Sequence, residues 1–289
     1  METVLSRSEE VRLRRFALEI RRQTICELHS LGSGHIGGCM SLAETMAVLY
    51  GGVLRVDPEH PDWPERDRLV VSKGHAGPVV YAALALRGFF PMDWLKTLNR
   101  PGTCLPSHTD ANKTPGVDMT TGSLGQGVSA AVGIALANRL QKRSNHVYAI
   151  AGDGECDEGQ VWEAALFAAS RNLNNLTLLV DRNWYQLDGS TRDVLALGNL
   201  EEKFRSFGWN TFTVQDGHDI SALYAALMQV REEQTAPTAL ILNTVKGKGY
   251  PAAMRGPNHH MVITDADYEE AMQALQKEER QLCREEGQA

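Results

Sequence analysis

Two apolar runs near the middle of the chain end in polar side chains that could bind a metal and a phosphate. The first run leads into Gly152-Asp153-Gly154, and the second ends in an Asp-Arg-Asn tripeptide that closes with Asn183. The segment between them has a helical pattern, which indicates a β-α-β unit with a carboxylate and an amide at the ends of its two strands. Such oxygen ligands suit Mg2+, and glycines let a phosphate approach the backbone closely. The stretch 152–183 therefore predicts a magnesium-diphosphate site.

Three histidines stand in segments that are typical of functional loops. His35 lies among four glycines, and His75 directly follows a short apolar run at 69–72. His108 lies in a stretch rich in Pro, Gly and Thr, 99–121, which is longer than a compact domain keeps unless the loop is functional or covered by a partner. Histidine suits proton transfer because its unperturbed pKa lies near neutral. The histidines for which we expect ordinary core or surface roles are His29, His60, His146 and His218.

Two further glycine-rich segments could contact anions. Residues 121–127 (TGSLGQG) open an expected helix, and such a helix start presents free backbone N–H groups. A basic loop, Lys246-Gly-Lys248-Gly, lies nearer the C-terminus. These lysines fit an ordinary solvated loop as well as they fit a binding role.

Helical and strand patterns alternate along the chain. A capping box at 41–44 is expected to start the second helix, Asp219 and Thr264 are expected to cap two later ones, and 186–199 is expected to be loop. Strands are expected at 69–72, 147–151, 176–180, 211–214 and 239–243. Helices are expected at 8–30, 76–86, 204–209 and 220–232, in a segment that ends at 140, and after 264. The alternation predicts an α/β fold, a three-layer, doubly wound and mainly parallel sheet with helices on both faces, in one domain over 1–289.

Composition and charge exclude several classes of protein. The 289 residues can bury a full core, and 22% charged with 43% hydrophobic residues is ordinary for a globular protein. The net charge of -7 argues against a nucleic-acid or anionic membrane surface, so we expect neither partner. The charged first thirty residues do not read as a signal peptide, and no apolar run approaches membrane-spanning length. Five scattered cysteines without a CxxC pair argue against a zinc site or a disulfide framework and favour the cytoplasm.

The motifs, taken in order, resemble the thiamine diphosphate-dependent transketolases. They read SGHIGG, RDRLVVSKGHAG, SHTDANKTPGVDMTTGSLGQG, GDGECDEG, DRN and DGHD. The resemblance extends from about residue 10 to 275 and covers the half of the enzyme that binds the cofactor diphosphate. Some organisms encode this half as a separate N-terminal subunit. The fold implied is the PP-type thiamine diphosphate-binding domain.

The resemblance implies roles for the residues of the cofactor site. The Mg2+ ligands would be the side chains of Asp153 and Asn183 and the backbone carbonyl of Tyr185, and Ca2+ or Mn2+ could substitute for Mg2+. Gly154 and His75 would contact the diphosphate. The other residues that the resemblance assigns to cofactor binding are Gly122, Ser123, Leu124, Gly152, Glu158 and Lys246.

The resemblance also implies a substrate channel. His35 and His108 would line it, hydrogen-bond sugar hydroxyls and move protons. A further catalytic histidine is His259 or His260: counting forward from Lys248 and Pro257 indicates His260, and counting back from Thr264 indicates His259. Acidic residues that would face a second active site across a dimer interface are Glu158 and Glu163.

Two departures from the family pattern bear on function. The family usually has a glycine after the metal-binding asparagine, whereas Trp184 and Tyr185 follow Asn183 here. No segment resembles the pyrimidine-binding domain, which supplies a glutamate to the aminopyrimidine and arginines to the substrate phosphate. The resemblance therefore implies an N-terminal transketolase subunit that moves a two-carbon ketol unit from a ketose, expected to be phosphorylated, to an aldose. It would be active only with a C-terminal partner subunit, in a heterotetramer.

Two other functions stay open at this point. One is a subunit of another thiamine diphosphate enzyme, similar to deoxyxylulose-phosphate synthase or to an E1 dehydrogenase. The other is a non-catalytic cofactor-binding or regulatory homologue, against which the presence of every expected metal and diphosphate group argues.

Overall fold

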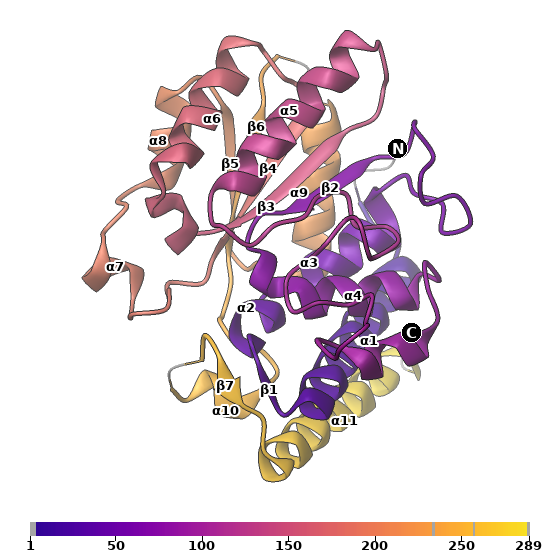
Figure 1. Ribbon diagram of the computed structural model, residues 1–289. Coiled ribbons are helices and arrows are strands. Elements are labelled where there is room, and N and C mark those ends of the chain that lie inside the picture. Colours follow the sequence, from indigo (N-terminus) through magenta and orange to yellow (C-terminus); the bar gives the residue numbers. More distant parts are fainter. Residues whose placement is uncertain (1–3, 233–234, 257, 288–289) are drawn as a thin grey trace.

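A five-stranded parallel sheet forms the centre of the molecule (Figure 1). The computed structural model describes residues 4–232, 235–256 and 258–287, so Pro257, one reference point for the C-terminal histidine, lies outside the described residues. The strand order is β2-β3-β4-β6-β5, and each neighbouring pair is parallel. The strands are β2 (Arg68–Val71), β3 (Val147–Gly152), β4 (Leu176–Arg182), β5 (Asn210–Val214) and β6 (Thr238–Asn243). A separate antiparallel pair joins β1 (Ser33–Gly34) to β7 (Met261–Val262).

Helices cover both faces of the sheet because the crossovers reverse direction once. The connections β2 to β3, β3 to β4 and β4 to β5 all run in the same direction across the sheet. Because such crossovers are right-handed, the helix that leads into each of these strands lies on the same face. The return from β5 to β6 places its helix on the other face. Helices on the first face are α5 (Gln126–Leu140), α6 (Gly159–Ser170) and α8 (Leu200–Ser206). Helices on the second face are α1 (Arg7–Leu31), α3 (Ala43–Val48), α4 (Gly77–Leu86) and α9 (Ile220–Glu232).

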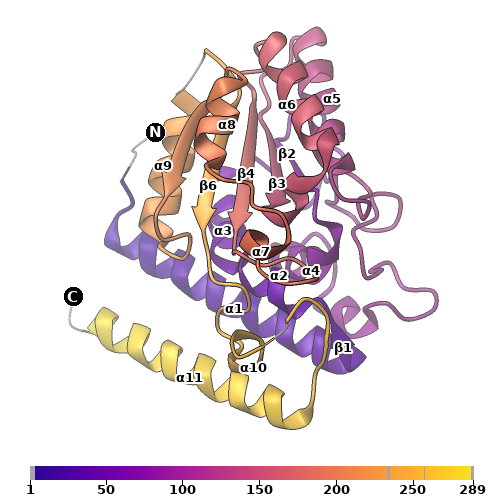
Figure 2. The same cartoon turned by 90° about the vertical axis from the view of Figure 1, so that its left-hand side faces the viewer.

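The remaining helices lie outside these two layers. The C-terminal helix α11 (Asp265–Gly287) runs along α1, where Arg14 and Arg22 pair with Glu285 and Glu279 (Figure 2). The short elements are α2 (Ile36–Met40), α7 (Thr191–Val194), α10 (Pro251–Met254), 3-10 turns at Gly74–Ala76, Met92–Thr97 and Gly154–Asp157, and a π-helical turn at Leu49–Val53. In the described parts of the chain, no helix is long and apolar enough to cross a bilayer. The α/β prediction, with its mainly parallel sheet and helices on both faces, is confirmed.

The central strands are apolar along their whole length because both of their faces are buried. In β3, Tyr148 and Ile150 pack into the core under α1, α3 and α4, whereas Val147, Ala149 and Ala151 pack into the core under α5 and α6. Strands that are covered on both faces lose the alternation of polar and apolar residues. The continuous apolar runs in the sequence have this origin.

One local prediction was wrong. Ser41 and Glu44 do not form a capping box, since α3 begins after Leu42 without a side-chain cap. Ser41 Oγ instead donates to Asp181, and Glu44 pairs with Arg21. Tertiary partners outcompete the local cap because both side chains are buried with them. The expected caps at Asp219 and Thr264 are confirmed, and the expected loop 186–199 contains the one-turn helix α7.

The long segment 99–121 contains no helix or strand and is anchored by hydrogen bonds to the elements beneath it. Asp118 accepts hydrogen bonds from Arg66 and from the backbone N–H of Leu69. The hydroxyl of Tyr81 donates to the carbonyl of Pro106 at 2.7 Å. Asp118 thus anchors the loop at the start of β2, and Thr121 Oγ1 anchors it at the end of that strand by donating to the carbonyl of Val71 at 2.7 Å.

The chain leaves β4 and β6 toward opposite faces of the sheet. From β4 it turns toward α8, and from β6 it turns toward α10 and α11 (Figure 2). A crevice forms at the carboxyl ends of strands where the connections diverge in this way, and ligands of doubly wound sheets bind there. The site therefore is expected between 183–189 and 244–260.

Candidate active site

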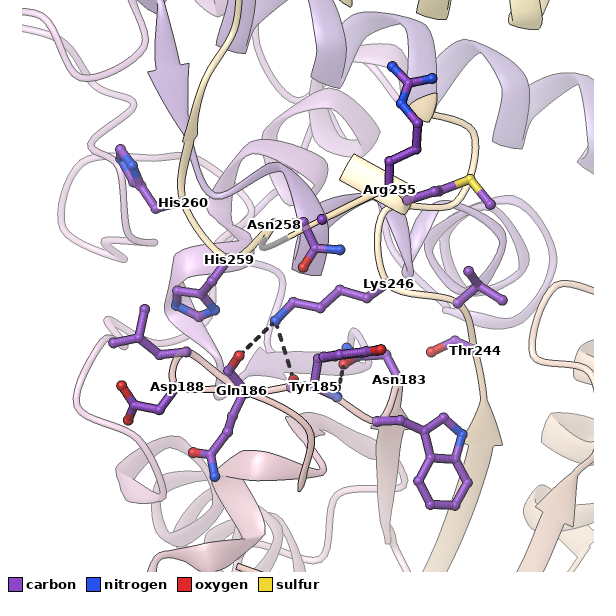
Figure 3. Close-up of a pocket in the computed structure, with 16 residues that line it drawn as sticks. Asn183, Tyr185, Gln186, Asp188, Thr244, Lys246, Arg255, Asn258, His259 and His260 are labelled. Atoms are coloured by element: carbon purple, nitrogen blue, oxygen red, sulfur yellow. Dashed lines mark hydrogen bonds between the residues drawn. The ribbon is translucent and has the colours of Figure 1, made fainter. Parts of the chain in front are cut away.

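Two adjoining cavities occupy this edge of the sheet. The first, of about 250 Å3, lies at the ends of β2, β3 and β4, and the second, of about 660 Å3, lies between 183–189 and 244–260 (Figure 3). The predicted site residues that line the first cavity are His35, His75, His108, Gly122, Leu124, Gly152, Asp153, Gly154, Asn183, Tyr185, Lys246 and His259. The lining residues for which the sequence predicted no role are Gly38, Lys73, Glu155, Gln186 and Leu187. We refer to the first cavity as the cleft.

His35 is the centre of a cluster of five imidazole rings. Its ring centroid lies 5.4 Å from that of His75, 5.5 Å from His108, 5.3 Å from His259 and 4.8 Å from His260. His75 and His259 also lie 4.8 Å apart. Four segments that are distant in sequence thus bring their histidines to one side of the cleft.

Burial keeps four of these imidazoles neutral, those of His35, His75, His108 and His259. Burial, reinforced by the neighbouring histidines, lowers the pKa of His35 to about 4. Burial and the charge of Lys73 lower the pKa of His75 to about 2, and burial lowers the pKa of His108. The pKa of His259 falls to about 4, mainly through burial. At neutral pH these rings can therefore accept protons or hydrogen bonds from a ligand.

Asp153 is a buried carboxylate at the end of β3. Its side chain accepts hydrogen bonds from the backbone N–H groups of Gly154 at 3.0 Å and Trp184 at 2.8 Å. Burial and the negative charge of Asp181 raise its pKa to about 6. A divalent cation would relieve both effects, because it supplies the positive charge that this carboxylate lacks.

Asp181, at the end of β4, organises the floor of the cleft. It is fully buried and accepts hydrogen bonds from Lys73 Nζ at 2.5 Å, Ser41 Oγ at 2.6 Å, Asn183 Nδ2 at 2.9 Å and Thr244 Oγ1. Burial opposes its ionisation most strongly, but the charge of Lys73 and the hydrogen bonds from Lys73, Ser41 and Thr244 together outweigh burial and lower the pKa of Asp181. The bond from Asn183 leaves the amide oxygen of that side chain facing away from the buried carboxylate.

Lys246 reaches the carbonyls of the loop after β4. Figure 3 shows its ammonium near the backbone oxygens of Tyr185 and Gln186, at 3.3 and 3.4 Å. Lys246 is 5% exposed, and burial together with the charge of Lys73 lowers its pKa to about 8. A positive charge thus lies beside the carbonyl that was predicted to bind the metal.

The comparisons with known proteins identify the family. The family model described as "Transketolase, thiamine diphosphate binding domain" matches residues 14–280. The chain belongs to the transketolase family. It is 48% identical over 271 residues to the 6-deoxy-6-sulfo-D-fructose transketolase subunit SqwG of Clostridium sp. (strain MSTE9), with 93% of this chain and 98% of that one covered. It is 38% identical to an apulose-4-phosphate transketolase subunit of Actinobacillus succinogenes, with 92% and 96% covered.

Solved transketolases share the fold over less than half of their own length. The enzyme from Campylobacter jejuni superposes with a TM-score of 0.86 at 28% identity, over 93% of this chain and 43% of that one. The enzyme from Leishmania mexicana gives 0.85 at 30% identity, over 91% and 41%. The chain is therefore an N-terminal-type transketolase subunit, of the kind that the split relatives encode separately.

The tryptophan that departs from the transketolase pattern occupies a left-handed backbone position. Trp184 has φ +68, a conformation that favours glycine. The guanidinium groups of Arg182 and Arg192 both lie over its ring, each 4.8 Å from a ring centroid. These cation–π contacts stabilise the loop that carries the carbonyl predicted to bind the metal.

Glu155, which the motifs did not single out, joins the end of β2, the start of α5 and the end of β3 in the transketolase subunit. Its carboxylate accepts from Ser72 Oγ at 2.5 Å and from the backbone N–H groups of Gly125 at 2.8 Å and Gly152 at 3.1 Å. The N–H of Gly125, expected to be free for a ligand, is therefore occupied. The available signal was an acidic residue directly after a buried strand and its glycine turn, since buried acids are rarely without partners.

The glycines around His35 permit close contacts between chain segments. A Cβ on Gly37 would lie 2.2 Å from the carbonyl oxygen of Asn258, and one on Gly38 would lie 3.3 Å from the ring of His75. The N–H of Gly37 donates to that same carbonyl at 3.1 Å. The segment before His259 can thus lie directly against α2.

The structure separates the two C-terminal histidines. His259 lines the cleft and points toward the Lys246 ammonium, whereas His260 points away and lines only the second cavity (Figure 3). Both rings still contact His35. His259, and not His260, therefore lies among the residues predicted to bind the cofactor.

The predicted metal ligands fit a hard cation. Asp153 supplies a carboxylate, Asn183 an amide oxygen and Tyr185 a backbone carbonyl, and all three residues line the cleft. Among the described residues, no group of three His, Cys, Asp or Glu side chains could hold a metal. Only one of the three predicted ligands, Asp153, has a side chain of this kind.

Besides His260, three predicted residues lie outside the cleft. Ser123 is exposed, and Glu158 is exposed at the start of α6. Glu163 is exposed further along α6. The acidic pair therefore faces outward on the surface of this subunit.

Proposed function

We propose that this chain anchors the diphosphate of thiamine diphosphate in a two-subunit transketolase. With its partner it moves a two-carbon ketol unit, a glycolaldehyde group, from a ketose to an aldose. The observation that carries the proposal is that one cleft contains both oxygen ligands for a metal and neutral histidines. Asp153 and Asn183 offer oxygen ligands on one side, and a cluster of neutral histidines around His35 faces them.

Cofactor binding would use the charged residues of the cleft. Mg2+, for which Ca2+ or Mn2+ could substitute, would be held by Asp153, Asn183 and the carbonyl of Tyr185. His75, Gly154 and Lys246 would hold the diphosphate, whose negative charge compensates the buried lysine. The backbone of the segment Gly122, Ser123 and Leu124 would meet the aminopyrimidine.

The histidines would handle the sugar. Thiamine diphosphate, when bound, supplies a carbon that accepts electrons as a carbon–carbon bond breaks. His35 and His108, neutral at working pH, would hydrogen-bond the sugar hydroxyls and accept a hydroxyl proton. His259 would contact both the sugar and the diphosphate, with His260 beside it.

A partner subunit would cover the open side of the cleft. Apolar side chains at and near its rim stay exposed: Met119 by 38%, Leu124 by 36%, Tyr185 by 53% and Leu187 by 67%. The pyrimidine-binding half of a transketolase would bury them and supply the glutamate that this chain lacks. Exposed Leu166 and Phe167 on α6, beside Glu163, support self-association, and we propose a heterotetramer of two copies of each half.

The substrate is proposed to be an anionic ketose. The relatives are named for a sulfonated ketose and for a phosphorylated branched sugar, and both carry an anionic group. We also propose a cytoplasmic location, where thiols stay reduced, because all five cysteines are unpaired.

Reconstitution tests the proposal. The chain, a purified pyrimidine-binding half, thiamine diphosphate and Mg2+ should transfer a ketol unit to an aldose only when all four are mixed. Fructose 6-phosphate and 6-deoxy-6-sulfofructose serve as parallel donors that differ in the anion. Activity of this chain without a partner would contradict the split-enzyme assignment, and binding without transfer in the full mixture would favour a regulatory homologue.

A further inference from the structure

Backbone hydrogen bonds satisfy only part of the loop that carries Lys246, including two within the loop, from Lys248 to Val245 and from Tyr250 to Gly247. We call residues 244–250 the lysine loop. Its N–H groups at Thr244 and Gly247 donate to the carbonyls of Arg182 and Gly37, at 3.1 and 3.0 Å. The N–H of Val245 and the carbonyl of Lys248, on either side of Lys246, find no backbone partner in the described residues. Side chains from elsewhere bind them.

His218 binds the first of these groups. Its Nε2 accepts from the backbone N–H of Val245 at 2.9 Å, and its Nδ1 lies 2.9 Å from Glu44 Oε2. A backbone N–H can only donate, so Nε2 carries the lone pair and Nδ1 carries the proton that it donates to Glu44. The two contacts define a neutral ring in one tautomer.

Arg21 binds the second group. Its Nε donates to the carbonyl of Lys248 at 3.0 Å, and its Nη2 pairs with Glu44 Oε1 at 2.6 Å. Glu44 thus bridges Arg21 and His218, and the side chains of all three are at most 8% exposed. Burial would raise the pKa of Glu44, but the charge of Arg21 and the hydrogen bond from His218 lower it to about 2.

The DGHD motif explains how His218 reaches the lysine loop. A Cβ on Gly217 would lie 2.6 Å from the Thr244 side chain and 2.9 Å from the carbonyl oxygen of Asn243. The N–H of Gly217 donates to that carbonyl at 2.7 Å. Only glycine lets the turn lie this close, so the expectation of an ordinary role for His218 was incomplete.

We propose that His218 is a positioning residue for Lys246. Together with Glu44 and Arg21 it holds the lysine loop at both sides of Lys246, so that the ammonium points into the cleft. Lys246 is buried, and its long side chain would otherwise sample many rotamers. The inference rests on the proposed role of Lys246 at the cofactor diphosphate.

Amide hydrogen exchange can test the hydrogen bond between His218 and Val245 in the absence of cofactor and partner. In the full chain, followed by NMR, His218→Ala should speed exchange of the Val245 amide by roughly tenfold or more, because an opened hydrogen bond exposes it. His218→Gln should restore protection, since its amide can accept from Val245 and donate to Glu44. His146→Ala, which removes a buried histidine just before β3, is the control and should leave Val245 unchanged. Equal exchange in wild type and His218→Ala would overturn the contact.

A double-mutant cycle tests the action through Lys246. In the mixture with the pyrimidine-binding half, His218→Ala should weaken binding of magnesium thiamine diphosphate by roughly tenfold, as for one lost charge-assisted contact. In a Lys246→Ala background the same substitution should add no further loss. An equal loss in both backgrounds would show that His218 does not act through Lys246. If the wild-type mixture fails to bind the cofactor, the proposed function falls, while the exchange experiment still decides whether His218 holds the loop.

Discussion

The side-chain amide of Asn183 donates a hydrogen bond to the carboxylate of Asp181, two residues earlier, at 2.9 Å. The bond commits the amide nitrogen, while the amide oxygen accepts from the backbone N–H of Tyr185 at 3.3 Å and keeps a second lone pair for a cation. Because Asp181 also pairs with Lys73 at 2.5 Å, a buried ion pair orients a proposed metal ligand.

Asp181→Asn should destabilise the protein strongly. Lys73 is 2% exposed and would remain buried without a counter-charge. We expect a loss of roughly 3–5 kcal/mol in the free energy of unfolding, measured by chemical denaturation. Adding Lys73→Met should recover most of it, and wild-type stability of the single variant would contradict the assigned pairing.

Asp153→Ala should abolish metal-dependent binding of thiamine diphosphate. The variant removes the carboxylate among the three proposed ligands, and we expect an affinity loss of at least roughly a hundredfold in calorimetry. Asp193→Asn on the exposed helix α7 is the control and should bind normally. Unchanged affinity of Asp153→Ala would place the metal elsewhere.

The Trp184→Gly variant should be more stable than the Trp184→Ala variant. The backbone has φ +68, where a Cβ costs about 1 kcal/mol, whereas glycine adopts this conformation without strain. Trp184→Gly and Trp184→Ala both lose the contacts with Arg182 and Arg192, so the comparison isolates the backbone. Thermal unfolding of the two variants provides the measurement. A more stable alanine variant would mean that the loop relaxes out of this conformation.

Glu27 should make stability fall as pH rises. It is 2% exposed, neither carboxylate oxygen has a hydrogen-bond partner among the described residues, and burial raises its pKa well above 4.5. The folded state thus keeps a proton that the unfolded state releases above about pH 4.5, so the free energy of unfolding decreases by up to about 1.4 kcal/mol per pH unit.

Glu27→Gln should remove this slope. Its side chain cannot ionise, so the difference in stability between variant and wild type should grow from pH 5 toward pH 8. Glu10→Gln, nearer the start of the same helix, is the control. Parallel pH profiles for Glu27→Gln and wild type would mean that Glu27 is ionised in the folded protein.

The residues next to strand ends could be predicted as site residues from the sequence. His75, Asp153 and Asn183 each follow an apolar run, and parallel strands bring their carboxyl ends to one edge. Glycine spacing pointed in the same way to His35 and Gly154. These inferences need only the order of elements along the chain.

The partners of residues that bind across the interior of the protein could not be predicted from the sequence. Glu44 was assigned to a helix cap, yet it is buried with Arg21 and His218, which lie 23 and 174 residues away. Glu155 was assigned no role, yet it binds Ser72 and the backbone of Gly125, which lie 83 and 30 residues away. Local patterns fail here because a buried charge takes whichever partner packing provides.

The sequence by itself was enough to predict the fold class, the polar residues at the strand ends and most of the residues that line the cleft. Apolar periodicity and glycine spacing are local properties, so they can be read without coordinates. Only the tertiary structure decided that Asp181 orients Asn183, that His259 rather than His260 lines the cleft, and that His218 reaches the lysine loop. These relations depend on distances between side chains that are remote in sequence, and packing alone sets those distances.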